Sequence, residues 1–139
     1  MTERIIIAER VPEHKRLGFL PAAFTTRLML RGEAMAYQEA GRMSDSYKGG
    51  MWEFYTLSNG GYYLAPVAPE RFAVRVDSNG YEGDVSADAF GVIVTLFVYG
   101  ALVWINDDNL QAKFSDHYHQ LRAFAIQHAE REAILNAID

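Results

Sequence analysis

Residues 47–66 read YKGGMWEFYTLSNGGYYLAP, and residues 76–97 read VDSNGYEGDVSADAFGVIVTLF. The first stretch is dense in aromatic residues and contains two glycine pairs. In the second, an Asn-Gly pair leads through a short polar segment into a long apolar run. This pattern is typical of two β-hairpins followed by a buried helix, because aromatic residues favour strands and Asn-Gly favours tight turns. These two stretches decide the fold.

The strands and their turns follow from the alternation of side chains. Four strands are expected, at residues 52–57, 62–67, 72–77 and 81–85. Ser58-Asn59-Gly60-Gly61 tolerates positive φ and should join the first two strands, whereas Asn79-Gly80 predicts a type I′ turn between the last two. One face of such a sheet is apolar and the other is half polar, so helices are needed on one face only.

The apolar run predicts the central helix of the core. Ser86 is expected to cap it and Asp88 lies in its first turn, where the helix dipole favours negative charge. Residues 89–105 carry no charge, but a membrane span needs about 20 apolar residues. Acidic residues flank the run on both sides and no Lys or Arg anchors it, so we expect a core helix and no membrane association.

Three more helices are expected, at residues 26–47 with Thr25 or Thr26 as the cap, at residues 110–128, and at residues 130–137. Before them, residues 3–24 offer only the short β-prone run Ile5–Ile7, followed by prolines. We therefore expect an α+β fold in which residues 1–139 form a single domain. Its sheet is an antiparallel β-meander of about four strands, with helices packed mainly on one face.

Composition places the chain in the cytoplasm. Half of the 139 residues are hydrophobic and none is cysteine, so a packed core without disulfides is expected. The apolar run near the N-terminus is four residues long, which is too short for a signal peptide.

Charge excludes two classes of function. The net charge is −5, with an excess of two basic residues in residues 1–50 and of six acidic residues in residues 51–110. A DNA mimic would need charges at about the density of duplex phosphates, one per 1.7 Å of axis. A general nucleic-acid binder would have a pI above about 9, whereas the pI here is about 5.3. The chain fits neither class.

Catalytic and metal-binding patterns are missing from the sequence. His117 and His119 are two positions apart on a predicted helix, so they point in nearly opposite directions and are interpreted as surface residues. Ser58 and Ser86 lack a nucleophile-elbow context, and the glycine pairs precede strands where a phosphate-binding loop would precede a helix. We expect no enzyme, no metal site and no cofactor.

A further pattern covers nearly the whole chain. It consists of Leu20-Pro21, Leu30–Glu33, Gly49-Gly50, Trp52, Phe54–Gly61, Asp77, Asn79-Gly80, Glu82-Gly83, Ser86–Asp88, Tyr118-His119, Leu121-Arg122 and Ala137–Asp139. In these residues the sequence resembles the ArdB/KlcA antirestriction family of bacterial proteins, which are carried mostly by plasmids and other mobile elements. The resemblance implies that the chain relieves restriction by type I restriction-modification systems and so protects incoming unmodified DNA.

The implied partner is the type I restriction-modification enzyme of the host, reached directly or indirectly. Because the acidic residues are too sparse to copy DNA, we expect protein contacts or an indirect route, with the chain acting as a monomer. The resemblance supplies no catalytic residues. Our candidates for partner binding are the exposed parts of the two turns and the acidic rim beside them, namely Asn59, Asp77, Asn79, Glu82 and Asp84. Asp88 is a further member of this rim, and the turn residues are equally explained by the needs of the fold.

The sequence leaves two other functions open. One is a nucleic-acid-binding accessory module of a mobile element, for which the candidate residues are Lys15, Arg16, Arg27, Arg31, Arg42 and Lys48. We expect no strong nucleic-acid binding, given the acidic composition. The other is a small hydrolase whose reactive residues converge only in the folded chain.

Overall fold

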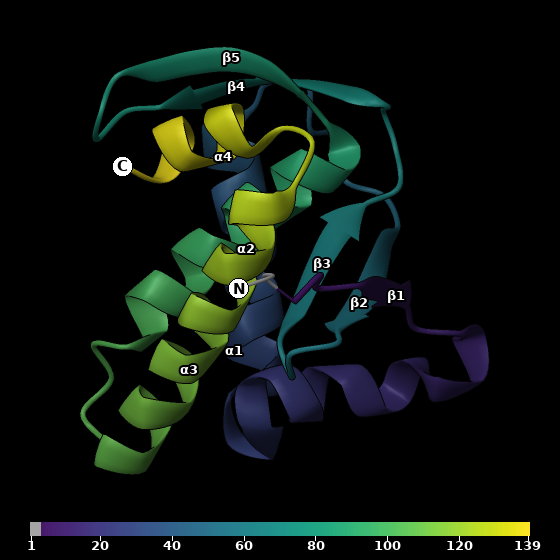
Figure 1. Cartoon of the computed structure of the whole chain (residues 1–139), viewed down its shortest axis with the longest axis vertical. Helices are drawn as coiled ribbons and strands as arrows, with labels where there is room; N and C mark the ends of the chain where they lie inside the picture. Colours follow the sequence, from purple (N-terminus) through teal and green to yellow (C-terminus); the bar gives the residue numbers. More distant parts are fainter. Residues whose placement is uncertain (1–3) are drawn as a thin grey trace.

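The computed structural model describes residues 4–139, and Figure 1 shows the path of the chain. The elements, in chain order, are strand β1 (Ala8–Arg10), 3₁₀-helix η1 (Glu13–Gly18), helix α1 (Phe19–Met43), strands β2 (Trp52–Leu57), β3 (Tyr62–Pro66), β4 (Arg71–Val76) and β5 (Tyr81–Ser86), and helices α2 (Ala87–Leu102), α3 (Asp108–Gln127) and α4 (Arg131–Ile138). The α+β class predicted from the sequence is confirmed.

The four predicted strands form two sheets where one continuous meander was expected. One sheet has the order β1-β2-β3 and the other consists of β4 and β5, all antiparallel. Pro66 ends β3 and Pro69 lies in the connection to β4. Pro66 is still paired with Trp52, and Val67 N donates to Met51 O at 2.9 Å, so the pairing with β2 runs one residue past Pro66 before the chain leaves for β4. Figure 1 shows the β4–β5 hairpin arching over one end of the helices, apart from the other sheet.

Strand β1 is an addition that the sequence did not reveal. Ala8 pairs with Leu57 and Arg10 pairs with Tyr55 on the outer side of β2. The predicted β-prone run Ile5–Ile7 lies just before it, and Ile5 and Ile7 are exposed. A strand of three residues, two of them charged, carries almost no periodic signal.

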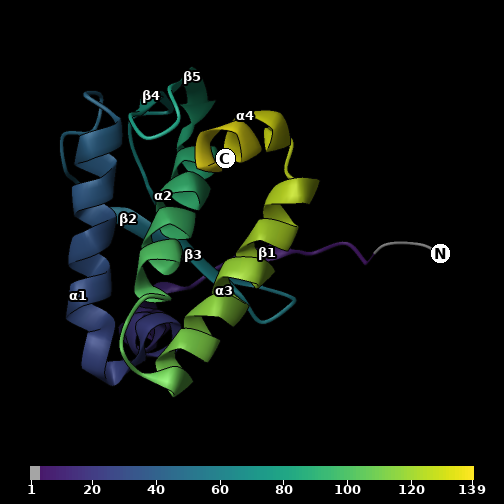
Figure 2. The ribbon, with the colours of Figure 1, turned by 90° about the vertical axis from the view of Figure 1, so that its left-hand side faces the viewer.

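Helix α2 is the centre of the molecule, as predicted. Most of its side chains are buried, and Figure 2 shows α1 on one side of it and α3 on the other. The Ser86 hydroxyl accepts a hydrogen bond from Ala89 N at 3.1 Å, which confirms the predicted N-cap. Within residues 4–139, no helix combines the length and the apolar character that a bilayer span requires.

Helix α2 lies directly against the edge of β3. A Cβ atom on Gly91 would come within 2.5 Å of Ala65 Cα and 2.6 Å of Leu64 O, so only glycine permits this approach. One turn later, Thr95 Oγ1 accepts from Leu64 N at 3.3 Å and lies 2.8 Å from Gly91 O. The helix therefore supplies the hydrogen bonds that another strand would have given to this edge of β3.

Helix α1 begins earlier than predicted and contains a kink. Thr25 has φ 68° and ψ 158°, which interrupts the helical backbone, and its hydroxyl accepts from Leu28 N at 3.3 Å. Thr25 therefore caps the straight part of the helix. The sequence predicted either Thr25 or Thr26 as this cap. The preceding turns, from Phe19 onward, lie across the first sheet, where the Phe19 ring stacks on Phe54 at 4.4 Å.

Candidate functional site

The β4–β5 hairpin carries four of the five predicted contact residues, and three of these four are acidic. Its inner face packs on the core and its outer face is exposed, in alternation along both strands. Glu82 and Asp84 lie on the outer face, and Asp77 is in the loop that joins the strands. The structure therefore brings these three acidic residues onto one exposed hairpin.

Arginines lie among these acids. Arg71 Nη2 lies 2.8 Å from Asp84 Oδ2, and Arg75 Nε lies 3.5 Å from Asp77 Oδ1. Arg75 is also the cross-strand neighbour of Glu82. The predicted acidic rim is thus an alternation of both charges, with Glu82 as the member that forms no ion pair within residues 4–139.

Asn79 holds the hairpin loop on helix α4. Its Nδ2 donates to Ala137 O at 2.9 Å, and its Oδ1 accepts from Tyr81 N at 2.9 Å. The loop has four residues, with Val76 paired to Tyr81, and of the Asn79-Gly80 pair only Gly80 has a positive φ, of 74°. The predicted two-residue type I′ turn is therefore wrong, since that turn needs positive φ at both positions.

Asn59 lies apart from the other candidates. Its Nδ2 donates to Gln120 O at 2.9 Å, and its Oδ1 accepts from Gly61 N at 3.1 Å. The bonds fix the β2–β3 loop on helix α3. Figure 1 shows that this loop lies far from the β4–β5 loop. The five predicted residues therefore divide into a hairpin group of four and one distant member.

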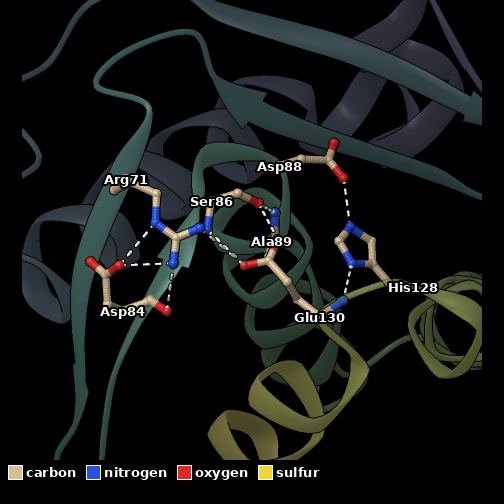
Figure 3. A network of polar contacts seen from close by, with 7 residues as sticks. All are labelled: Arg71, Asp84, Ser86, Asp88, Ala89, His128 and Glu130. Carbon is tan, nitrogen blue, oxygen red and sulfur yellow. Dashed lines mark hydrogen bonds and ion pairs between the residues drawn. The ribbon is translucent and has the colours of Figure 1, made fainter.

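A polar network joins the base of this hairpin to the start of α4 (Figure 3). Ser86 N donates to Glu130 Oε1 at 2.9 Å, and the Ser86 hydroxyl donates to Glu130 Oε2. Arg71 Nη1 lies 3.7 Å from Glu130 Oε1. A single carboxylate thereby holds together the end of β5, the start of α2 and the loop before α4.

Asp88 belongs to this network and not to the outer face of the hairpin. Its Oδ2 lies 2.7 Å from His128 Nε2, and its Oδ1 accepts from the Tyr63 hydroxyl at 2.7 Å. Its side chain is still 40 % exposed, but both oxygens have partners inside the molecule. Asp88 is therefore not a free carboxylate of the acidic rim. Figure 3 shows the His128 ring between Asp88 and the Glu130 backbone.

The hydrogen bonds around His128 define which of its two ring nitrogens carries the hydrogen. Glu130 N donates to His128 Nδ1 at 2.9 Å, so Nδ1 is an acceptor and the ring hydrogen sits on Nε2, facing Asp88. Burial alone would raise the pKa of Asp88, but the hydrogen bonds from His128 and Tyr63 outweigh it and lower that pKa. Burial and the Asp88 carboxylate raise the pKa of Tyr63.

This geometry does not match nucleophilic catalysis. A serine nucleophile needs an imidazole nitrogen that accepts its proton, whereas the Ser86 hydroxyl donates to a carboxylate and both nitrogens of His128 have other partners. The network instead fixes four elements against one another. The sequence missed it because its members come from β3, β4, β5, α2 and the α3–α4 connection, which no local spacing links.

His117 is buried, which corrects its interpretation as a surface residue. Its exposed fraction is 7 %, its ring packs against Tyr62 and Tyr99, and its Nδ1 lies 3.1 Å from Gln120 Oε1. Burial lowers its pKa. His119 is exposed, as expected. Among residues 4–139, no three His, Asp or Glu side chains gather at a point where they could hold a metal ion.

Half of the basic residues considered for nucleic-acid binding are already engaged. Arg16 donates to Trp52 O at 2.8 Å, and its guanidinium lies 4.2 Å from the centre of the Phe54 ring. Arg27 pairs with Asp107 and Arg42 pairs with Glu39. Lys15, Arg31 and Lys48 are exposed. Two of the six residues, Arg16 and Arg27, therefore tie separate elements together, and Arg42 pairs within α1, so the six do not form one set of free cations.

Comparison with known proteins shows the family. The family model described as Antirestriction protein matches residues 45–139. This chain belongs to the antirestriction protein family. Two Escherichia coli proteins named Antirestriction protein KlcA are each 47 % identical, one over 135 residues and the other over 137. Each alignment covers 96 % of this chain and at least 94 % of the relative.

Two further comparisons give lower sequence identities. The Escherichia coli K12 protein YfjX, named as uncharacterized, is 34 % identical over 135 residues, which cover 94 % of this chain and 86 % of the relative. A solved structure matches with a TM-score of 0.91 and 43 % identity, and covers 100 % of this chain and 99 % of its own. It is described as showing that KlcA and ArdB have a novel fold and antirestriction activity against Type I DNA restriction systems in vivo but not in vitro.

Proposed function

We propose that this protein relieves type I restriction in a bacterial host and so protects incoming unmodified DNA, such as a plasmid. The observation that carries the proposal is the end-to-end similarity to antirestriction proteins, at 47 % identity in sequence and a TM-score of 0.91 in structure. Members of the family in which the whole domain is retained are expected to share its action. The protein would act in the cytoplasm, where a host enzyme meets entering DNA.

The proposed route is a protein contact or an indirect effect, and not imitation of DNA. A mimic would present carboxylates at something like the spacing of phosphates, about one charge per 1.7 Å of duplex axis. The most acidic hairpin here alternates its carboxylates with Arg71 and Arg75. An indirect route also agrees with the description of KlcA and ArdB as active in vivo but not in vitro.

We further propose that the protein works by binding, as a monomer, and not by catalysis. In the polar network that most resembles a reactive site, the hydrogen bonds hold structural elements together. The hairpin group of Asp77, Asn79, Glu82 and Asp84 remains the proposed contact surface, while Asn59 is a distant candidate. Of these, Glu82 is the side chain whose charge is least engaged inside the molecule.

The test is the plating efficiency of unmodified phage on a host with a type I restriction system, with and without expression of the chain. We expect a rise of several orders of magnitude toward the efficiency on a host that lacks restriction. Phage already modified by the same system is the control, and its plating should not change. No rise across hosts of several type I families would refute the proposal.

The contact surface is tested in the same assay with Glu82→Lys. The control is Asp116→Lys, an exposed position on α3 that also exchanges one acidic for one basic side chain. Immunoblotting checks that both variants accumulate equally. Loss of antirestriction by Glu82→Lys alone supports the hairpin as the contact surface, whereas equal activity of the two variants excludes it.

A further inference from the structure

The outer edge of β4 is unpaired in the described part of the chain, because the second sheet contains only β4 and β5. Glu70 O accepts from Ala87 N and Val76 O accepts from Gly80 N, so even-numbered residues direct their backbone groups toward β5. In an antiparallel strand the odd-numbered residues then point the other way. Arg71, Ala73 and Arg75 thus present their N–H and C=O groups at the free edge.

One of these outward groups has a weak partner. Ala73 N lies 3.5 Å from Ser46 Oγ, in the segment after α1. This contact confirms that the N–H of Ala73 points away from β5. Its length is beyond the usual range of 2.7–3.2 Å for N–H···O bonds, so a better acceptor could replace it.

A groove lies along this edge. Two cavities of about 340 and 250 Å³ adjoin there, and both are lined by Met43 at the end of α1 and by Arg75 of β4. Val76 and Phe97 line the first and make it apolar. A free strand edge beside a groove, with the end of a helix on the far side, is an arrangement in which an extended peptide can add a strand.

The charges of the groove indicate which kind of ligand it can attract. Its arginines are neutralised within the molecule, since Arg42 Nη2 lies 2.7 Å from Glu39 Oε2 and Arg75 is paired with Asp77. The second cavity is lined by Asp45 and Glu82. Both are exposed, and neither forms an ion pair with a residue in the range 4–139. The groove therefore carries two unneutralised carboxylates, which attract cationic side chains and repel phosphates.

We propose that this groove binds an extended, basic segment of a partner protein, which pairs with the outer edge of β4 as a third strand. At a rise of about 3.3 Å per residue, a segment of five or six residues covers β4. Side chains of such a segment alternate between the two sides of the sheet, so an apolar residue can enter the cavity over Met43 while a Lys or Arg meets Asp45 and Glu82. That the partner acts in restriction rests on the proposed function, whereas the binding itself does not.

The first experiment selects ligands without assuming a sequence. A phage-displayed library of random nine-residue peptides is panned on the full chain and, in parallel, on the double variant Asp45→Asn/Glu82→Gln. We expect the wild-type chain to enrich peptides that combine Lys or Arg with apolar residues, and the double variant to lose them. Failure to enrich any peptide, or the same enriched peptides on both proteins, would overturn the proposal.

The second experiment tests the strand geometry. The enriched peptide is labelled with fluorescein, and its affinity is measured by fluorescence polarisation. Methylation of the peptide N–H groups at alternate positions removes its main-chain donors and keeps its charge. In one of the two registers we expect binding to weaken by about five- to thirtyfold, the loss that removal of one or two hydrogen bonds of about 1 kcal/mol each produces. Unchanged affinity in both registers would rule out pairing with the strand.

Two further controls complete the design. Asp116→Asn removes one exposed carboxylate elsewhere, so it should bind the peptide as the wild-type chain does. Backbone amide shifts on peptide addition should centre on residues 71–77; shifts confined to other residues would refute the site. Displacement of the peptide by a duplex oligonucleotide would indicate that the groove binds nucleic acid, which would also contradict the proposal. If the chain binds the peptide but does not raise phage plating, the groove is a peptide-binding site and the proposed antirestriction function is refuted.

Discussion

At the scale of single residues, the packing of the molecule depends on a few positions where a larger side chain would not fit. Gly91 and Thr95 lie one turn apart on α2 and face the edge of β3. The first lets the helix approach the strand and the second satisfies its backbone groups. This contact joins the first sheet to the core helix, so substitutions at these two positions should be costly.

Replacing Gly91 by alanine should destabilise the protein by about 1–3 kcal/mol, the usual cost of overpacking a rigid contact. The new Cβ would meet backbone atoms of Leu64 and Ala65, which cannot rotate away. The measurement is urea unfolding. Gly100→Ala, in the same helix, is the control because its Cβ would find its nearest neighbour at 3.8 Å. It should be neutral or stabilising by up to about 1 kcal/mol, and equal losses in both variants would contradict the explanation.

His117 should make stability dependent on pH near neutrality. Its pKa is lowered from the ordinary value of 6.5 by burial, so the unfolded chain takes up a proton at a higher pH than the folded one. Stability is therefore complete above pH 6.5 and falls as the pH drops below it. In His117→Phe, the decrease in the free energy of unfolding between pH 7 and pH 5 should be smaller. The exposed His119→Phe should retain the wild-type decrease, and a retained decrease in both would exclude His117 as its source.

At the scale of elements, side chains from one element repeatedly complete the hydrogen bonds of another. Asn59 fixes the β2–β3 loop on α3, Asn79 fixes the β4–β5 loop on α4, and Glu130 fixes the end of β5. Both asparagines therefore have structural roles, and of the proposed contact residues Asp77, Glu82 and Asp84 have the greater freedom to meet a partner.

Asn79→Ala should cost about 1–2 kcal/mol, because it removes hydrogen bonds worth about 0.5–1.5 kcal/mol each. These bonds run to Ala137 O and from Tyr81 N. Chemical denaturation measures the loss. Ser78→Ala, at the exposed neighbouring position of the same loop, should have little effect. If the two variants were equally stable, the tie between the hairpin and α4 would be energetically irrelevant.

The junction around Asp88 predicts a second dependence on pH. The folded-state pKa of Asp88 lies below its ordinary value of 3.8 because His128 and Tyr63 donate to the carboxylate and outweigh its burial. Its contribution is therefore present above that value and is lost as the pH falls through the lower folded pKa. Asp88→Asn should lower the melting temperature at pH 7 and differ less from the wild type at pH 3.

The control for this prediction is Asp108→Asn. Asp108 also lies in the first turn of a helix but is exposed, so it reports the dipole contribution alone, about 0.3–1 kcal/mol. A loss in Asp88→Asn no larger than that in Asp108→Asn would show that the bonds to His128 and Tyr63 add nothing.

At the scale of the whole molecule, two separate sheets share one core. β3, β4 and β5 all contact α2, and α1, α3 and α4 contact it as well. α2 contacts both sheets, and α1 covers the remaining apolar side chains of β2, where Phe19 stacks on Phe54 and Tyr37 packs on Trp52. The chain should therefore behave as one cooperative unit, as single domains below about 150 residues usually do.

Cooperativity can be measured in the variant Trp104→Phe, which leaves Trp52 as the single tryptophan. Trp104 is 84 % exposed and Trp52 is 2 % exposed, so fluorescence then reports the core of the first sheet. Its urea transition should coincide with that of the helical circular dichroism signal. Separate midpoints would show that the first sheet opens independently of the helices.

The sequence alone determined the local structure and the family. Residues 52–57, 62–66, 71–76 and 81–86 form strands, Ser86 caps α2, and the uncharged run is the core helix, because alternation, turn chemistry and hydrophobicity act over a few neighbouring residues. The candidates at Asp77, Glu82 and Asp84 were also placed on one exposed hairpin, since strand parity is a local property.

The tertiary structure decided everything that depends on distant pairs. It divided the strands into two sheets, added β1 to the edge of β2, buried His117 between aromatic rings, and turned Asp88 toward His128. It also placed the end of α1 beside the free edge of β4, which created the groove. Many of these contacts join residues that are distant in the chain, such as Asp88 and His128, which are 40 positions apart. No local pattern records them, because the close-packed core selects the partners only when all elements meet.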